Sequence, residues 1–269
     1  MGNTKKISVI TGASSGIGLG TARALLSRGY TVYNLSRSRS PEPAVISIRC
    51  DVCSENDIAD AFIRIAEKSG GIDLLICNAG FGISGAVEFT ENADAERLFE
   101  VNFFGVYRCI KSALPLLRSD KNEKRAGRII MTSSVAAVFA IPFQAFYSAS
   151  KAAVNMLAFA LSNELSTFGI QVCTVMLGDA RTGFTDAREK TLAGDGLYRG
   201  AISHSVSAME KDERGGMNAD FIGKKICRIA EKRRMPSKCV IGGKYKFFVF
   251  LSRLLPQGLQ NKIVGKMYK

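Results

Sequence analysis

A tyrosine and a lysine four residues apart, Tyr147 and Lys151, form the pair of side chains in this sequence best suited to chemistry. On a helix, side chains at this spacing share a face. A phenol has a pKa of about 10, so it exchanges a proton at neutral pH only where a positive charge stabilises its anion. Lys151 would supply that charge. A solvated helix face with the same two residues is the alternative that the pair alone leaves open.

A glycine-rich turn near the start of the chain is a second chemical feature. A short apolar run at 5–10 leads into Thr11-Gly-Ala-Ser-Ser-Gly-Ile-Gly18, and the apolar pattern of 19–28 is typical of a helix. The glycines let the backbone turn tightly and approach a pyrophosphate, whose charge the amide groups of a helix N-terminus favour. Glycine-rich loops are common, so the flanking strand and helix carry this prediction of a nucleotide site.

The residues that follow the second predicted strand, 31–36, distinguish between two nicotinamide cofactors. A site for NAD normally carries Asp or Glu there, to hold the ribose 2′-hydroxyl. This chain has Arg37 and Arg39 among serines instead. Because a guanidinium suits a 2′-phosphate, which a carboxylate would repel, the sequence favours NADP over NAD. A solvated arginine in a loop is the alternative.

The elements that must position these residues alternate along the chain. Strands are predicted at 45–48, 72–77, 127–132 and 171–176, and helices at 54–68, with Ser54 as N-cap, and at 93–117. This alternation predicts an α/β fold with a doubly wound parallel sheet (Rossmann fold) in a single domain over 1–269. Ligands of such sheets bind beyond the carboxyl ends of the strands, where Asp51 and Asn78 fall together with the glycine turn.

Taken together, these motifs resemble the short-chain dehydrogenase/reductase (SDR) family. The matching features, in the family's order and spacing, are the Thr11–Gly18 turn, Asn78-Ala79-Gly80, Asn102, Ser134 and Tyr147-x-x-x-Lys151. The resemblance covers roughly residues 5 to 185. It implies an enzyme that transfers a hydride between the nicotinamide of NAD(P)H and a carbonyl or alcohol carbon.

The family resemblance assigns roles to four catalytic residues. Tyr147 would donate the proton in reduction, and Lys151 would lower the pKa of that phenol and bind the nicotinamide ribose. Ser134, thirteen residues before the tyrosine, would hold the substrate oxygen. Asn102 would hold a water that links Lys151 to solvent, although a mid-helix asparagine can also be merely exposed.

The resemblance also implies contacts with the cofactor, for which NADP(H) is expected to be preferred over NAD(H). These contacts would come from Gly12, Ser14, Ser15, Gly16, Ile17, Gly18, Arg37, Asp51, Val52, Asn78, Ala79, Gly80, Tyr147, Lys151 and Thr182. One departure is Leu177-Gly178, where the family usually has Pro-Gly. We expect activity to survive, because the missing proline removes no chemical group.

Residues 183–216 occupy the position of the family's substrate-binding insertion and are predicted to form a lid. Apolar residues around the site suit a lipophilic ketone or alcohol, and core packing would explain any one of them equally well. Substrate contacts are expected from Ser134, Phe139, Phe143, Tyr147 and Phe184. Motifs such as Gly216-Met217 and Leu254-Leu-Pro256 resemble the hydroxysteroid and retinol dehydrogenase branch. The alternatives are a 3-oxoacyl carrier-protein reductase and an NADP-binding regulatory protein without turnover.

The formal net charge of +13 is concentrated at the C-terminal end. From Phe221 onward, 13 Lys and Arg residues stand against the single acid Glu231. The segments 221–234 and 244–255 mix apolar and basic residues, and 243–269 is a basic extension. Weak peripheral contact with an anionic membrane is one interpretation, and lysines flanking a helix packed on the fold or on another subunit are the other. A nucleic-acid-reading motif is absent, so no nucleic-acid partner is expected.

The remaining composition, with 46% hydrophobic residues, is that of a globular protein. The N-terminus has no signal-peptide pattern, so a cytoplasmic location is expected. The seven cysteines are expected to be reduced core residues. Cys50-x-x-Cys53 lacks a second pair, and His204 is the chain's only histidine, so no metal site is expected. The family resemblance implies a homodimer or homotetramer.

Overall fold

The computed structural model describes residues 5–118 and 127–268. Lys269, the last residue of the predicted basic extension, lies outside the described residues. Seven parallel strands form the central sheet, in the order β11-β7-β6-β4-β1-β2-β3. Their bounds are β1 (Ile7–Thr11), β2 (Thr31–Ser36), β3 (Ile46–Arg49), β4 (Leu74–Cys77), β6 (Arg128–Ser134), β7 (Gln171–Leu177) and β11 (Lys238–Ile241). The predicted doubly wound parallel sheet is confirmed, and β11 adds a strand that the sequence patterns did not indicate.

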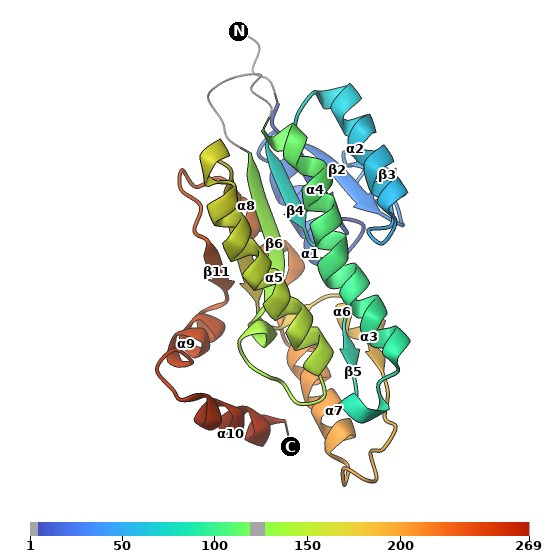
Figure 1. Cartoon of the computed structure of the whole chain (residues 1–269), viewed down its shortest axis with the longest axis vertical. Coiled ribbons are helices and arrows are strands. Elements are labelled where there is room, and N and C mark those ends of the chain that lie inside the picture. Colours follow the sequence, from blue (N-terminus) through green and yellow to red (C-terminus); the bar gives the residue numbers. More distant parts are fainter. Residues whose placement is uncertain (1–4, 119–126, 269) are drawn as a thin grey trace.

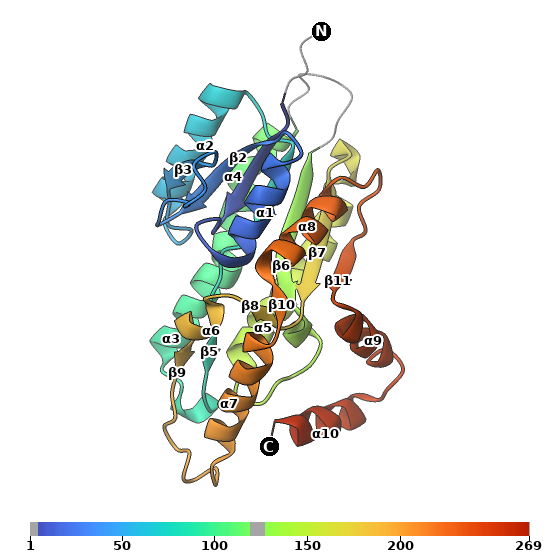
Figure 2. The same cartoon turned by 180° about the vertical axis from the view of Figure 1, so that it is seen from behind.

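Helices cover both faces of this sheet, and therefore its inner strands are mostly apolar, with β4 (Leu-Leu-Ile-Cys) apolar throughout. One face carries α2 (Glu55–Ser69), α4 (Gly105–Leu117) and α5 (Ala145–Glu164), as Figure 1 shows. The opposite face carries α1 (Gly16–Leu26) and α8 (Ala219–Ala230), as Figure 2 shows. Helices α1 and α8 approach closely at Gly20, where a Cβ atom would lie 2.6 Å from the carbonyl oxygen of Ala219.

The predicted long helix over 93–117 is instead interrupted near its middle. It consists of α3 (Asn92–Phe99), the π-helical turn η2 (Glu100–Phe104) and α4. A π turn inserts an extra residue into the helical repeat, and such turns are frequent at functional sites. Asn102 lies inside η2 and is fully buried. The interruption therefore coincides with a predicted catalytic residue.

The predicted lid segment, 183–216, lies over the carboxyl ends of the strands, at the lower end of Figures 1 and 2. Two short parallel ladders attach this region to the body, β5 with β9 and β8 with β10. The bounds here are β5 (Ile83–Ser84), β8 (Ala180–Arg181), α6 (Phe184–Ala187), β9 (Glu189–Lys190), α7 (Ala201–Arg214) and β10 (Met217–Asn218). Short 3₁₀ turns complete the fold at η1 (Val87–Phe89), η3 (Val135–Ala137) and η4 (Ser166–Phe168).

The basic extension folds as two helices, α9 (Gly243–Leu251) and α10 (Gln257–Met267). They lie outside the layered body, beyond the edge strand β11, and α10 runs back toward the lid end of the molecule (Figures 1 and 2). Among residues 5–118 and 127–268, no helix has the length and apolar character needed to cross a membrane.

Candidate functional site

A cavity of about 1010 Å³ lies at the carboxyl ends of the strands, which is at the upper end of the range of ligand pockets. It is lined by the glycine turn, the loops after the central strands, the start of α5 and the lid region. The predicted site residues that line it are Gly12, Ser14, Ser15, Gly16, Ile17, Arg37, Asp51, Val52, Asn78, Ala79, Gly80, Ser134, Tyr147, Lys151, Thr182 and Phe184. Gly18, Asn102, Phe139 and Phe143 are not among the lining residues.

The glycine turn has the backbone that a phosphate cradle requires. Gly12 and Gly16 adopt positive φ angles of 74° and 51°, which glycine tolerates best. At Gly18, a Cβ atom would lie 2.2 Å from the Gly12 carbonyl oxygen, so no side chain fits there. Ser15 is the N-cap residue of α1 and makes no side-chain capping bond. The turn thus fits a bound pyrophosphate at the N-terminus of α1.

Thr11 joins this turn to the predicted Asn78-Ala79-Gly80 segment. Its hydroxyl oxygen accepts the backbone N–H groups of Asn78 and Ala79, both at 2.9 Å. The Asn78 side chain in turn donates to the carbonyl oxygens of Thr11 and Gly12, at 3.2 and 3.3 Å. Two segments more than sixty residues apart are therefore fixed against each other beneath the cavity.

Asn34 is a supporting residue that the sequence analysis missed. This fully buried side chain of β2 accepts the backbone N–H of Ala13 at 2.8 Å and donates to the carbonyl oxygen of Ser38 at 3.3 Å. It therefore connects the glycine turn with the loop that carries Arg37. An asparagine within a doubly covered apolar strand was the available signal, because buried polar groups need such partners.

Tyr147 and Lys151 lie on the first turns of α5 with the lysine nitrogen 5.8 Å from the centre of the phenol ring. The Lys151 Nζ donates to the backbone carbonyl of Thr132 at 3.3 Å. Burial lowers the pKa of Lys151 to about 8, since no solvent stabilises its charge. Burial also raises the pKa of Tyr147 to about 12, while a hydrogen bond with the Ser134 hydroxyl opposes that rise.

The two neighbouring serines at the end of β6 have different partners. Ser133 is buried and donates to the carbonyl oxygen of Lys151 at 3.2 Å, so it holds the start of α5 against the strand. The Ser134 hydroxyl oxygen accepts the backbone N–H of Ala136 at 3.1 Å. A hydrogen bond with the Ser134 side chain lowers the pKa of Tyr147, so Ser134 is the serine beside the phenol.

The predicted substrate contacts divide into two groups. The Phe184 ring lies 5.8 Å from the Tyr147 ring, in the wall of the cavity. Phe143 adopts a positive φ of 59° and packs edge-on against Tyr198 at 5.6 Å, and Phe139 does not reach the lining. From the same 139–144 segment, the lining residues are Ile141 and Gln144.

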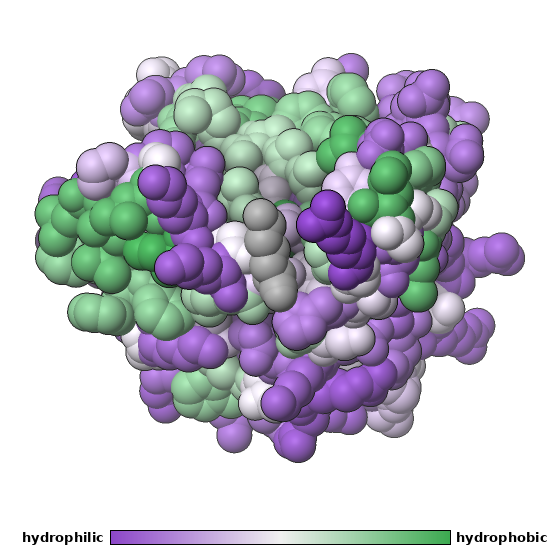
Figure 3. Space-filling view, turned by 90° about the horizontal axis from the view of Figure 1, so that it is seen from below, coloured by the Kyte–Doolittle hydropathy of each residue, from purple (hydrophilic) through white to green (hydrophobic). Residues whose placement is uncertain are grey.

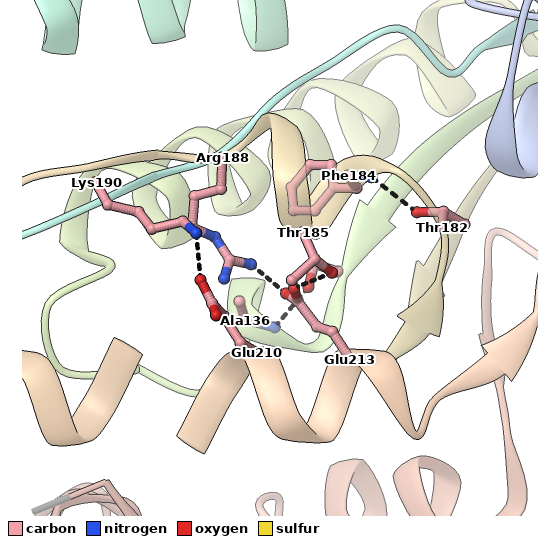
Figure 4. A network of polar contacts seen from close by, with 9 residues as sticks. Ala136, Thr182, Phe184, Thr185, Arg188, Lys190, Glu210 and Glu213 are labelled. Atoms are coloured by element: carbon pink, nitrogen blue, oxygen red, sulfur yellow. Dashed lines mark hydrogen bonds and ion pairs between the residues drawn. The ribbon is translucent and has the colours of Figure 1, made fainter. Parts of the chain in front are cut away.

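A buried ion pair secures the lid beside the phenol (Figure 4). Glu213 on α7 accepts a hydrogen bond from the Thr185 hydroxyl at 2.7 Å and pairs with Arg188, whose side chain is 1% exposed. The Nε and Nη1 atoms of Arg188 are buried without a hydrogen-bond partner. Glu213 raises the pKa of Tyr147 and Arg188 lowers it, through their charges. A second pair, Lys190 with Glu210, lies further out and is more exposed.

The C-terminal extension also contributes to the cavity wall. At Gly178, a Cβ atom would lie 2.2 Å from the ring of Tyr245 on α9. The Tyr245 hydroxyl donates to the carboxylate of Asp179, whose pKa is raised by burial. Tyr268, directly after α10, is another lining residue. The loop that lacks the family's proline is thus held by an aromatic side chain of the extension.

Two cysteines, Cys50 and Cys53, line the cavity near Asp51. Burial, together with nearby carboxylates, raises the pKa of Cys50 to about 12 and that of Cys53 to about 11. Both thiols therefore stay protonated at neutral pH and are poor nucleophiles or metal ligands. All seven cysteines of the chain are free, and the described ranges contain no cluster of three metal-ligating side chains.

Known proteins share both the sequence pattern and the fold. A family model described as short chain dehydrogenase matches residues 6–193. The 3-ketodihydrosphingosine reductase of Bacteroides thetaiotaomicron is 38% identical over 240 residues, which are 88% of each chain. The NADPH-dependent 1-acyldihydroxyacetone phosphate reductase of Saccharomyces cerevisiae is 29% identical over 279 residues, covering 98% of this chain and 92% of that one. A short-chain dehydrogenase structure from Streptomyces avermitilis superimposes with a TM-score of 0.81 at 26% identity, over 94% of each chain.

Proposed function

Because this chain belongs to the short-chain dehydrogenase/reductase family, whose members are NAD(P)-dependent oxidoreductases acting on CH–OH groups, we propose that it reduces the ketone of a long-chain amphipathic lipid with NADPH. The observation that carries this proposal is the extent of the similarity to the 3-ketodihydrosphingosine reductase. An alignment over 88% of the chain spans the whole of 183–216 wherever it begins. The likeness therefore includes the predicted lid as well as the nucleotide-binding half.

The residues around Tyr147 supply the acid–base part of this reduction. A bound nicotinamide would supply the hydride, and the phenol of Tyr147 would deliver the proton that converts the ketone oxygen into a hydroxyl group. The Ser134 hydroxyl, which lies beside the phenol, donates to the same oxygen as its negative charge develops. The charged form of Lys151 favours the phenolate that remains, and solvent restores its proton.

The charges in the cavity favour an amine-bearing lipid over a phosphate-bearing one. Among the described lining residues, three are basic: Arg37 and Lys151, which we assign to the cofactor, and Arg97. Arg97 already pairs with Asp94 and Glu189. The acidic lining residues are Asp51, Glu96, Glu100, Asp179, Glu189 and Glu213. Glu100, Glu189 and Glu213 are paired with arginines, and Asp51 is assigned to the cofactor, so Glu96 and Asp179 are the acids left for the amine of a 3-ketodihydrosphingosine. A phosphate head meets no unpaired, unassigned cation among the same described lining residues.

NADP(H) remains the proposed cofactor, with Arg37 binding the 2′-phosphate. Arg37 is exposed, lines the cavity and follows β2. The side chain of Asn34 holds the loop that carries Arg37 by donating to the carbonyl oxygen of Ser38. The relative from Saccharomyces cerevisiae is described as NADPH-dependent, which supports the same choice. A hydroxysteroid is the second substrate candidate, on the strength of the motifs at 216–217 and 254–256.

A substrate panel with NADPH and NADH in parallel tests the proposal. The ketones are 3-ketodihydrosphingosine, 1-acyldihydroxyacetone phosphate, a 17-ketosteroid and a short 3-oxoacyl thioester. We expect the highest kcat/KM with 3-ketodihydrosphingosine and NADPH. Tyr147→Phe is the inactive control, expected to lose about 10²–10⁴-fold in turnover. Tyr107→Phe, which removes an exposed phenol from α4, is the matched variant with normal turnover.

Two outcomes would contradict this assignment in different ways. Preferential reduction of the steroid or of the short thioester would replace the substrate class and leave the catalytic residues in place. If Tyr147→Phe turned over as fast as Tyr107→Phe, Tyr147 would not be the proton donor. The oligomeric state stays a prediction, which light scattering of the purified protein would measure directly.

A further inference from the structure

Helix α9 exposes an apolar stripe to solvent. Phe247, Phe250 and Leu254 recur at positions i, i+3 and i+7, a spacing that places them on one face of α9 and the turn after it. They are 61%, 59% and 65% exposed. Val249, on another face of the same helix, is buried against the body. The apolar stripe therefore faces solvent, on the side of α9 away from the buried Val249.

Helix α10 repeats this arrangement. Leu259, Ile263 and Met267 recur at i, i+4 and i+8 and are all exposed, while Gln260 and Val264 are buried. Figure 3, viewed from the lower end of Figure 1, shows a hydrophobic bulge at the left, the side on which α9 lies in Figure 1. Hydrophilic side chains border that bulge. Within the described residues, no other segment covers either stripe.

Basic residues accompany both stripes. Lys246 and Arg253 directly precede Phe247 and Leu254, and Lys262 and Lys266 directly precede Ile263 and Met267; all four are exposed. The chain has no Asp or Glu from 243 to 268. Each helix therefore carries a row of cations beside its row of apolar side chains, with no opposing charge of its own.

We propose that α9 and α10 dock on the surface of an anionic lipid bilayer. An amphipathic helix binds such a surface by burying its apolar face at the headgroup boundary while its lysines and arginines meet the anionic lipids. A second copy of this chain is the poorer occupant, since a two-fold contact would bring this cationic surface against itself. An anionic bilayer offers both partners that this surface needs: anionic headgroups for its cations and an apolar interior boundary for its stripes.

The position of α10 connects this surface to the cavity. Tyr268, directly after α10, lines the cavity and packs on a cluster formed by Ala86 and three residues of the lid helix α7, Ile202, Val206 and Met209. In Figures 1 and 2, α10 lies at the same end of the molecule as α7. Docking would therefore bring this end of the cavity close to the bilayer. If the substrate is the long-chain ketone of the proposed function, docking brings the cavity next to the bilayer in which that ketone is dissolved.

Co-sedimentation of the full-length protein with vesicles tests the docking. The vesicles are phosphatidylcholine alone and phosphatidylcholine containing phosphatidylglycerol. We expect pelleting with the anionic vesicles only, and roughly tenfold or more weaker binding for Lys262→Glu/Lys266→Glu. The matched control is Arg64→Glu/Lys68→Glu, which reverses two exposed charges at the same spacing on α2 and should bind normally.

The apolar contribution has its own matched pair. Phe250→Ser should weaken vesicle binding, whereas Ile63→Ser, which removes a side chain of similar exposure from α2, should not. Equal pelleting of the wild type and Lys262→Glu/Lys266→Glu, or no pelleting of the wild type, would overturn the proposal. A dimer that Phe250→Ser converts into a monomer, without vesicle binding by the wild type, would assign the surface to a second copy instead.

Turnover separates this inference from the proposed function. With a ketone dissolved in vesicle-free buffer, Lys262→Glu/Lys266→Glu and Phe250→Ser should match the wild type. With 3-ketodihydrosphingosine embedded in anionic vesicles, both variants should be slower. Vesicle binding without reduction of any lipid ketone would support docking and contradict the proposed substrate. If the wild type and both variants reduced the embedded lipid at equal rates, the docking would be contradicted and the proposed substrate class would be supported.

Discussion

The carboxamide of Asn102 forms two hydrogen bonds with the backbone of Phe81: Oδ1 accepts the N–H at 3.0 Å, and Nδ2 donates to the carbonyl oxygen at 2.9 Å. Nδ2 also lies 3.2 Å from the hydroxyl oxygen of Ser150, the residue before Lys151. A Cβ atom on Gly80 would lie 2.8 Å from Oδ1 and 3.4 Å from the Lys151 nitrogen. Asn102 therefore positions the loop after β4 against the first turns of α5.

Replacing Asn102 tests this positioning role. Asn102→Asp loses the donor to the Phe81 carbonyl, and Asn102→Ala leaves both backbone groups of Phe81 unpaired in the interior. We expect a loss of about 1–3 kcal/mol in the free energy of unfolding for each group left unpaired, together with reduced kcat. Urea unfolding and steady-state kinetics measure the two effects. Full stability with lost activity in Asn102→Ala would favour the predicted water relay over positioning.

The lowered pKa of Lys151 predicts an effect of pH on stability. The folded value is about 8 and the ordinary value 10.5, so the folded state disfavours the charged lysine. Burying the charged lysine lowers the free energy of unfolding; this destabilisation is fully present below pH 8 and disappears as the pH rises toward 10.5. Lys151→Met should therefore raise the free energy of unfolding at pH 7 by up to about 3 kcal/mol, while turnover is lost.

Urea unfolding of Lys151→Met and the wild type at pH 7 and pH 10 measures this difference, which should shrink at the higher pH. The exposed Lys224→Met on α8 is the control and should show no such dependence. In the wild type, the rate of ketone reduction should fall as the pH passes about 8, because the charge beside Tyr147 is lost. A Lys151→Met variant less stable than the wild type at pH 7 would contradict the buried-charge argument.

Cofactor choice is expected to depend on Arg37 and not on Arg39. Arg37 lines the cavity, whereas Arg39, two residues later and also exposed, does not. Arg37→Ala should raise the KM for NADPH by roughly 10- to 100-fold, the value of a charge-assisted hydrogen bond, and leave the KM for NADH unchanged. Arg39→Ala should alter neither constant. Equal effects of both variants would mean that diffuse positive charge, and no specific contact, sets the preference.

The two ion pairs of the lid should differ greatly in their importance. Glu213→Gln leaves the buried guanidinium of Arg188 without its counter-charge, which in an interior costs about 3–5 kcal/mol. We expect a lower melting temperature and faster proteolysis within 183–216. Glu210→Gln breaks the more exposed pair with Lys190 and should cost about 1 kcal/mol or less. Arg188→Met/Glu213→Gln should recover much of the lost stability, and its failure to do so would point to Thr185 as the main partner.

The local patterns of the sequence were sufficient for six of the seven strands of the central sheet and for most of the predicted cofactor-binding residues that line the cavity. Strands β1, β4 and β7 are largely apolar runs followed by Gly12, Asn78 and Gly178, and the carboxyl ends of parallel strands converge by geometry alone. For this reason Gly12, Asn78 and Tyr147 could be placed at one edge of the sheet from the sequence alone. The hydroxysteroid prediction relied on motifs outside this pattern, and the relatives named above do not support it specifically.

What the sequence did not indicate depends on contacts between distant residues. The partners of Asn34 lie in other elements, and the contribution of Tyr268 to the cavity depends on how α10 returns to the body. Phe143 was expected in the pocket from its apolar character, but the backbone turns there at a φ of 59° and the ring packs on Tyr198. The π turn around Asn102 likewise has no signature in a helical apolar repeat.

The contact between Tyr245 and the Gly178-Asp179 loop bears on how the chain can be divided. Because α9 provides the ring that lies on Gly178 and the hydroxyl that binds Asp179, the extension is an integral part of the wall of the cavity. A chain shortened to residue 242 would lose this wall together with its cationic helices. Truncation therefore cannot separate catalysis from surface binding. The core and the extension are one folding and functional unit, not two interchangeable modules.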